Sequence, residues 1–335
     1  MAYKRHENQN FVFSVILISY RHEDFIADAI KSIKFQDYDY SKYELIIICR
    51  SSSGIRAIIG DLDLECNVRF IINDDYRIGP KFLEALKMAQ SQWIAVIDDD
   101  DMWVPKKLKA LDELISQYPD LIYIHNGKYI VDEDFHYTDT SLPREEKLIS
   151  PCSKNERSIM KDFRKNCEHN ESSIAFSKTI VNGKLDSLAL LEGALDTFLF
   201  VSAIEYGGKI ICLNEKLTFF RVTSKNNQSE YAKNQLNNLK RQLQSYIVIR
   251  NMKLTNHFTQ WLIDWHIMYN RLKINLMEDT KTRRRDRFEF LLESIRNKFF
   301  KSREGLYFEF LFVLQFISER ASRYIYKLAI NVLSR

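Results

Sequence analysis

Four consecutive aspartates at positions 98–101 are the residues of this sequence whose type and spacing point most directly to chemistry. They follow an apolar run at 93–97 and precede Trp103. Adjacent carboxylates repel one another, and nothing in the packing of a strand requires them. Hard oxygen ligands suit Mg²⁺ or Mn²⁺, and such a cation can share its remaining positions with phosphates. The alternative is a solvated loop in which Asp101 caps the helix that Pro105 opens.

The glycine pattern excludes two common ways of binding phosphate. Nine glycines and five prolines in 335 residues are too few for a collagen-like, linker-like or Pro-rich disordered chain. No G-x-G occurs, and there is no G-x-x-x-x-G-K-[ST], so neither the dinucleotide fingerprint nor the phosphate loop is present. If the protein binds nucleotide phosphates, it needs another device, such as a cation on the aspartates.

The cysteines and the N-terminus bear on the compartment. The five cysteines are odd in number, widely spaced and free of any C-x-x-C, so the pattern indicates neither a zinc site nor a disulfide framework. The polar N-terminus and the short apolar segment after it are not typical of a signal peptide, and no window approaches about 18 uninterrupted apolar residues. We expect a cytoplasmic location, or one at the cytoplasmic face of a membrane.

The first half of the chain alternates between apolar strands and amphipathic helices. The strands are expected at 11–19, 44–49, 68–73 and 93–98, and the helices at 24–35, 80–90 and 104–118. This order predicts an α/β fold with a mostly parallel sheet flanked by helices, whose ligand crevice lies beyond the carboxyl ends of the strands. Those ends carry Ser19, Tyr20, Arg50 and the aspartates.

The middle of the chain is less regular. The apolar pattern of residues 121–131 predicts one or two further strands. The polar, charged composition of residues 133–165 predicts a mobile loop. The remaining segments are expected to be strands at 172–176, 210–213 and 217–222 and an apolar helix at 188–206.

The charge distribution divides the chain. Residues 1–224 hold 28 Lys and Arg against 35 Asp and Glu, a formal net charge of −7, whereas residues 225–335 hold 21 against 10, a net charge of +11. Beyond residue 208 only Gly305 and no proline remains. We therefore predict an α/β domain at 1–224 and a basic, all-helical region at 225–335, with helices at 230–255, 257–278, 282–302 and 304–333.

The last predicted helix has apolar residues at helical spacing with Arg320, Arg323 and Lys327 near the edges of that face. Such a helix can lie in an anionic membrane interface, as in a peripheral membrane protein, or pack on a sibling helix or on another copy in a homo-oligomer. The arginines at 283–285 and 287 are typical of a solvated helix face. Without an aromatic-interleaved basic patch or a reader motif, we expect no nucleic-acid partner.

Ordered landmarks across residues 12–224 resemble the GT-A glycosyltransferases of family 2. The segment 14–20 (SVILISY) looks like the family's opening S-V-I-I-P-T-Y-N, and 98–103 (DDDDMW) looks like its D-x-D-D-hydrophobic-W. Asp196 before an apolar helix, then 207–209 (GGK) and 220–222 (FRV), look like its E-D-x-x-L-W, G-G-K and Y-R-V. The order and spacing of these motifs carry the resemblance.

The resemblance implies a metal-dependent, inverting transfer of sugar from a nucleotide-sugar donor to a hydroxyl acceptor. The acceptor would be a glycan, a polysaccharide or a lipid-linked saccharide. It implies that Asp98 lies near the ribose or a metal-bound water and that Asp100 ligates Mn²⁺ or Mg²⁺. Asp196 falls at the position of the catalytic base, with a helix N-terminal carboxylate as the alternative.

The resemblance also assigns further donor and acceptor residues. Donor contacts are expected from Ser19, Tyr20, Arg50, Asp98, Asp99 and Arg221, with Arg221 near the diphosphate. Acceptor contacts are expected from His169, Trp103 and Glu192.

Departures from the family pattern affect the detail. Residues 49–52 (CRSS) replace the family's D-D-G-S, so the base-reading aspartate is absent and a uridine donor cannot be assumed. Leu195 replaces the glutamate of the E-D pair, although Glu192 lies one helical turn earlier. Arg77 and Lys81 are further candidates for a phosphate contact.

Two alternatives remain open at this stage. One is a catalytically silent nucleotide-sugar-binding subunit of a glycan assembly complex, suggested by the missing base-reading aspartate. The other is a haloacid-dehalogenase-type phosphatase with Asp98 as the nucleophile and Asp100 as the acid/base. Phosphatases of this type normally have a residue with a small hydroxyl side chain shortly after the two aspartates, whereas this chain has Met102 and Trp103.

Overall fold

A computed structural model describes residues 11–19, 25–137, 147–149, 167–222 and 228–278 of the protein. The chain divides into two compact units. The first contains residues 1–224 and 248–260, and the second contains residues 225–247 and 261–335. The predicted domain boundary after residue 224 stays a prediction, and the segment 248–260 groups with the first unit.

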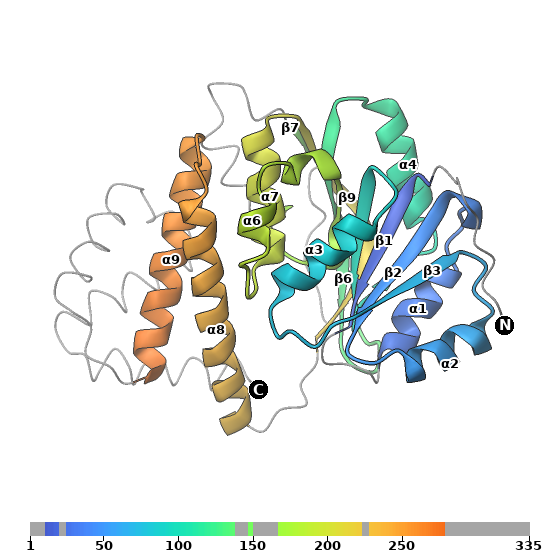
Figure 1. The fold of residues 1–335 in the computed structure, drawn as a ribbon, viewed down its shortest axis with the longest axis horizontal. Helices are drawn as coiled ribbons and strands as arrows, with labels where there is room; N and C mark the ends of the chain where they lie inside the picture. The colour runs from blue at the N-terminus through green and yellow to red at the C-terminus, as the bar shows by residue number, and fades with distance from the viewer. Residues whose placement is uncertain (1–10, 20–24, 138–146, 150–166, 223–227, 279–335) are drawn as a thin grey trace. The chain divides into compact units, whose positions relative to one another are not determined.

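One mixed sheet forms the centre of the first unit (Figure 1). Within the described residues it has nine strands in the order β3-β2-β1-β4-β8-β6-β9-β5, with β7 beside β9. Parallel pairing joins β3, β2, β1 and β4 and also joins β6 to β9, while β5, β7 and β8 are antiparallel to their neighbours. The strands are β1 (Phe13–Ile18), β2 (Tyr43–Cys49), β3 (Asn67–Ile72), β4 (Trp93–Asp98), β5 (Met102–Trp103), β6 (Leu121–Val131), β7 (Lys147–Ile149), β8 (Ile174–Ser177) and β9 (Lys209–Arg221).

Helices cover both faces of this sheet. One face carries α1 (Ile26–Lys34), α2 (Ser53–Leu62) and α4 (Lys107–Gln117), whose apolar residues share a core with alternate strand residues, among them Ala175 and Ile124. The sequence neighbours of these strand residues point to the opposite face of the sheet. Phe176 meets Phe82 of α3 (Ile78–Met88), and Tyr123 meets Phe200 of α7 (Leu195–Tyr206), with ring centroids 6.3 and 6.0 Å apart. Because both faces of β1 and β2 are covered, every residue of these two strands is buried. The predicted α/β fold is confirmed.

The antiparallel strand β8 brings a distant segment to the end of β4. Ala175 of β8 pairs with Ala95, and Phe176 pairs with Ile94. The residues before β8 therefore run alongside the carboxyl end of β4, where the aspartates begin. They form a 3₁₀ turn, η2 (Glu171–Ser173). This pairing is what places η2 beside residues that lie about 70 positions earlier in the chain.

Several elements differ from the prediction. The helix α2 was not predicted from the sequence, and the two segments expected at 210–213 and 217–222 are a single strand, β9. The predicted helix 188–206 is wrong in its start, because α6 (Leu185–Leu188) ends first and α7 begins only at Leu195. Ala194 between them is left-handed, with φ 53°, which interrupts a continuous helix. The strand β7 lies in the stretch that was expected to be a loop.

The helices α8 (Gln228–Asn251) and α9 (His257–Glu278), most of whose residues belong to the second unit, account for two of the predicted C-terminal helices. The rings of Tyr246 and His266 stack with centroids 4.5 Å apart, and Lys240 pairs with Glu278. The helices predicted at 282–302 and 304–333, including the basic amphipathic one, lie outside the described residues. Among the residues that are described, no helix has the length and apolar character needed to cross a membrane.

The start of α3 depends on Gly79. Its amide donates to the carbonyl of Leu191 at 3.0 Å, and a Cβ at this position would lie 1.9 Å from the carbonyl oxygen of Leu188. We predict that Gly79→Ala lowers the free energy of unfolding by roughly 1–3 kcal/mol, because the backbone must move to admit the methyl group. Urea titration measures this change.

Gly60, within α2, provides a matched control. A Cβ at Gly60 meets nothing within 4 Å. Gly60→Ala is therefore expected to stabilise the protein by about 0.5–1 kcal/mol through helix propensity. Equal effects of the two substitutions would contradict the proposed close approach at Gly79.

Candidate active site

The backbone carbonyl of Ser172 in η2 accepts three hydrogen bonds. It accepts from Trp103 Nε1 at 3.0 Å, from Lys107 Nζ at 2.6 Å and from Thr218 Oγ1 at 3.1 Å. The Ser172 hydroxyl oxygen also accepts from the amide of Asp98 at 2.9 Å. These donors come from β5, α4, β9 and β4, so one buried serine ties η2 to four elements. Trp103, predicted to contact the acceptor, is itself buried here, with 2% of its surface exposed.

Lys107 is a fully buried lysine that belongs to this arrangement. Its ammonium group lies 4.4 Å from the centre of the Trp103 ring and also donates to Thr218 Oγ1 at 3.1 Å. Burial lowers the pKa of Lys107 well below its ordinary value, and the nearby Asp101 carboxylate opposes that shift. The side chain therefore acts as a fixed donor within the core.

The aspartate cluster lies immediately beside η2. Asp99 and Asp101 are buried, and Asp98 and Asp100 are half-buried. Burial, followed by the charges of Glu171 and Asp101, raises the pKa of Asp98 well above its usual range. Burial and the Asp100 carboxylate raise the pKa of Asp101 to about 7. The carboxyl groups of this cluster therefore repel one another and resist ionisation.

The donor set of this cluster fits a hard divalent cation. Asp101 Oδ1 accepts from the amide of Arg221 at 2.9 Å, whereas its buried Oδ2 has no hydrogen-bond partner among the described residues. A buried carboxylate oxygen in this state needs a partner, and Mn²⁺ or Mg²⁺ takes oxygen ligands of this kind. The alternative that Asp101 caps α4 is wrong, because α4 follows Lys106 and has no side-chain cap.

Arg221 stands at the end of β9 beside this cluster. Its Nη2 donates to Asp28 Oδ2 at 2.9 Å, and its guanidinium lies over the rings of Phe25 and Phe135, 4.1 and 4.9 Å from their centres. Nε and Nη1 of Arg221 are buried without a hydrogen-bond partner in the described part of the chain. Two fixed N–H donors in such a setting suit an anionic oxygen. The predicted diphosphate contact of Arg221 stays a prediction.

Asp196 lies in the first turn of α7 and faces the segment before η2. Its Oδ1 accepts from the Thr197 amide at 2.7 Å, and its Oδ2 accepts from the Asn170 amide at 3.4 Å. His169 Nδ1 lies 3.7 Å from the same Oδ2, and its side chain is half exposed. Asp196 and His169, predicted as base and acceptor contact, are thus brought together.

The backbone is strained on both sides of Asp196. Asn170 has φ 82° and Ala194 has φ 53°, a region that non-glycine residues seldom occupy. Each such conformation costs on the order of 1–3 kcal/mol and is held by its surroundings. At Asn170 the surroundings include its own side chain, which donates to Ser173 Oγ at 3.0 Å. The strained Asn170 is also the residue whose amide donates to the Asp196 carboxylate.

Glu171 connects the two acidic groups, and sequence reasoning gave it no role. Burial, followed by the charge of Asp196, raises the pKa of Glu171 to about 8, and Asp101 adds to the effect. Its charge acts on Asp98 as well. The only signal in the sequence was an acidic residue within the polar run 169–173, which is too common a feature to assign.

The other predicted residues are distributed along the carboxyl ends of the strands. Ser19 follows β1 and is buried, while Tyr20 lies outside the described residues. Arg50 is exposed after β2, and its charge adds to burial in lowering the pKa of the buried Lys81. Arg77 pairs with Asp75 at 2.7 Å, and Glu192 accepts from the Tyr76 hydroxyl at 3.5 Å.

The chain is similar in sequence and in fold to known glycosyltransferases. Residues 14–177 match the family described as glycosyl transferase family 2. An uncharacterized glycosyltransferase of Methanocaldococcus jannaschii is 22% identical over 270 residues, which cover 78% of this chain and 87% of that protein. An uncharacterized glycosyltransferase of Nostoc is 23% identical over 224 residues, covering 65% and 67%. The crystal structure of residues 1–349 of S. aureus TarS has a TM-score of 0.53 at 15% identity, covering 78% of this chain and 72% of that one.

Over residues 14–177 the chain is a family 2 glycosyltransferase, and it has a GT-A-like fold. The resemblance seen in its motifs is therefore confirmed, and the phosphatase alternative is set aside. The aspartate cluster at the end of β4 and Asp196 at the start of α7 are the candidate active site of this glycosyltransferase.

Raised carboxyl pKa values make stability depend on pH in a defined direction. Glu171 and Asp101 hold their protons to higher pH in the folded chain than in the unfolded one. Folding is therefore favoured at low pH, and this contribution is lost as the pH rises from about 4.5 to about 8. We predict that the free energy of unfolding in EDTA falls across this window.

Glu171→Gln should flatten this pH dependence, because glutamine stays neutral. Glu113→Gln, which changes an exposed residue of α4, should keep the slope of the unchanged protein. Urea titrations at about pH 5, 6.5 and 8 provide the measurement. Identical slopes for the two variants would contradict the role given to Glu171.

Proposed function

We propose that this glycosyltransferase uses a nucleoside-diphosphate sugar and a divalent cation, and that it inverts the anomeric carbon. The observation that carries the proposal is the group of carboxylates with raised pKa values, Asp98, Asp101 and Glu171, gathered beside Arg221 and Asp196. We assign the cation to Asp98 and Asp100, and the buried Oδ2 of Asp101 is a further candidate ligand. A bound Mn²⁺ or Mg²⁺ supplies positive charge next to the departing diphosphate.

Asp196 is the proposed base. Its carboxylate, oriented by the amides of Thr197 and Asn170, takes the proton of the acceptor hydroxyl. The acceptor oxygen bonds to the anomeric carbon on one face as the bond from that carbon to the diphosphate oxygen breaks on the other. Arg221 offers Nε and Nη1 to the negative charge that develops on the diphosphate. His169 lies on the acceptor side of Asp196.

The donor nucleotide is the open part of the proposal. S. aureus TarS, whose fold this chain shares, has been solved in complex with UDP-GlcNAc, which supports a nucleotide-sugar donor. In this chain, however, residues 49–52 lack the base-reading aspartate, and Arg50 stands there. A panel of uridine, guanosine and other nucleotide sugars is therefore required. A donor that binds the folded state raises the melting temperature by mass action, and the increase should require Mn²⁺ or Mg²⁺.

Two substitutions separate the proposed roles. Asp100→Asn should abolish the cation-dependent thermal shift and lower kcat/KM by about 10²–10³-fold. Asp196→Asn should keep the thermal shift and lower kcat by about 10²–10⁴-fold, because only proton removal is lost. Release of nucleoside diphosphate in the presence of acceptor measures turnover.

Asp186→Asn is the matched control, since Asp186 is exposed on α6 and should leave both measurements unchanged. If each of the two single variants, Asp100→Asn and Asp196→Asn, kept full transfer activity, the assignment of the cation ligand and of the base would be refuted. The alternative of a catalytically silent binding subunit is favoured by the missing base-reading aspartate. It predicts a thermal shift without donor hydrolysis or transfer for every nucleotide sugar in the panel.

We also propose that the basic region 225–335, with its net charge of +11, brings the site to a lipid-linked saccharide at the cytoplasmic face of a membrane. The full chain should float with vesicles that contain anionic lipid and should be released by salt. Vesicles of neutral lipid are the control. A folded chain that stays at the bottom of the gradient with both kinds of vesicle would leave helix packing or self-association as the role of this region.

A further inference from the structure

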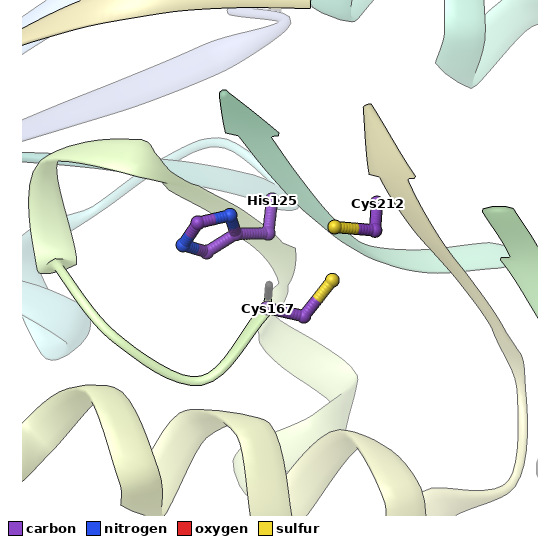
Figure 2. A group of neighbouring side chains, drawn as sticks. All are labelled: His125, Cys167 and Cys212. Atoms are coloured by element: carbon purple, nitrogen blue, oxygen red, sulfur yellow. The ribbon is translucent and has the colours of Figure 1, made fainter. Parts of the chain in front are cut away.

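A buried group of one histidine and two cysteines lies apart from the aspartates. His125 on β6, Cys212 on β9 and Cys167 in the segment before η2 are 1%, 2% and 0% exposed. One potential ligand atom from each lies within 4.8 Å of the others. Figure 2 shows the sulfur atoms of Cys167 and Cys212 near each other on one side of the His125 Cβ atom, with the imidazole ring extending to the other side.

The sheet brings these residues together. His125 and Cys212 are direct partners in the parallel pairing of β6 with β9, so their side chains leave the same face of the sheet. Cys167 is held over that face because its carbonyl accepts from the Tyr123 hydroxyl at 2.8 Å. The spacing of 42 and 45 residues between successive members explains why no local motif revealed the group.

The hydrogen bond of His125 shows which ring nitrogen carries the proton and which carries the lone pair. Nε2 lies 2.7 Å from the carbonyl oxygen of His169. A carbonyl can only accept, so Nε2 carries the proton and Nδ1 carries the lone pair. Histidines that ligate metals are oriented in this way, with the second ring nitrogen donating to a backbone carbonyl. Two thiols and an imidazole lone pair are soft and borderline ligands, unlike the hard oxygens of the aspartates.

We propose that His125, Cys167 and Cys212 bind Zn²⁺, at a site distinct from that of the catalytic cation. In a tetrahedral zinc site the ligand atoms lie roughly 3.3–3.8 Å apart, so on binding the ligand atoms must approach by about 1 Å and the imidazole must turn toward the sulfur atoms (Figure 2). The bound ion would join the segment 167–170 to β6 and β9. That segment carries His169 and Asn170, and the Asn170 amide donates to Asp196. The zinc therefore positions the residues that orient the proposed base.

The test begins with the full chain purified without chelator. Elemental analysis should find about one Zn²⁺ per chain after reconstitution with zinc and gel filtration. Substitution with Co²⁺ should give a thiolate-to-cobalt charge-transfer band, which carboxylates do not produce. Cys167→Ser and Cys212→Ser should each remove that band and most of the zinc.

Controls come from two other buried cysteines. Cys49→Ala and Cys66→Ala change buried cysteines that lie outside the group and form no disulfide, and both variants should keep the zinc and the band. Asp100→Asn should also keep both while it loses the Mn²⁺-dependent donor shift, so the zinc site and the proposed catalytic site can fail separately.

The unchanged protein alone can overturn the proposal, even if the cysteine variants fail to fold. The proposal fails if folded protein takes up less than about 0.1 Zn²⁺ per chain and shows no cobalt–thiolate band. His125, Cys167 and Cys212 would then be ordinary buried side chains of the core. A Cys167–Cys212 disulfide, seen by mass spectrometry of the freshly purified chain, would overturn it as well.

Discussion

The site depends on the hydrogen bonds to the carbonyl of Ser172. Three donors converge on this oxygen, and one of them is the buried ammonium of Lys107. A buried donor or acceptor that loses its hydrogen-bond partner costs about 1–3 kcal/mol, so each of these three bonds opposes movement of η2. η2 is therefore held firmly in one place. Its neighbours along the chain, Glu171 and Asn170, are positioned as a consequence.

This constraint has an electrostatic cost. By fixing η2 between β4 and β9, it places Glu171 within reach of the charges of Asp98, Asp101 and Asp196. The raised pKa values express the mutual repulsion of these carboxylates together with their burial. Backbone strain at Asn170 and Ala194 adds to the cost. Electrostatic repulsion and backbone strain concentrated at one place are typical of a functional site, where a bound ligand of opposite charge offsets the repulsion.

The sequence was most informative where local pattern decides structure. Strands buried on both faces read as continuous apolar runs, so β1, β2 and β4 were predicted closely, and the aspartates followed at a strand end. The sequence did not predict α2 because Ser53, Gly54 and Gly60 are poor helix formers. The helix forms there because Ile55 and Ile59 pack into the core. The start of α7 depends on one left-handed residue, Ala194, for which alanine gives no signal.

Long-range pairing was the part that pattern could not supply. Nothing near His125 indicates that it faces Cys212, because the register of β6 against β9 arises only when the sheet forms, and it includes irregular steps. The antiparallel insertion of β8 between β4 and β6 is of the same kind, and it brings Ser172 to Asp98. Both pairings act on one short segment, 167–173. Ser172 anchors its end through hydrogen bonds, and in the proposed zinc site Cys167 anchors its beginning. With both ends fixed, the strained Asn170 between them has little freedom to relax, and its amide is held toward Asp196. The proposed base, oriented in this way, loses little entropy when the acceptor arrives, because the protein has already ordered it during folding.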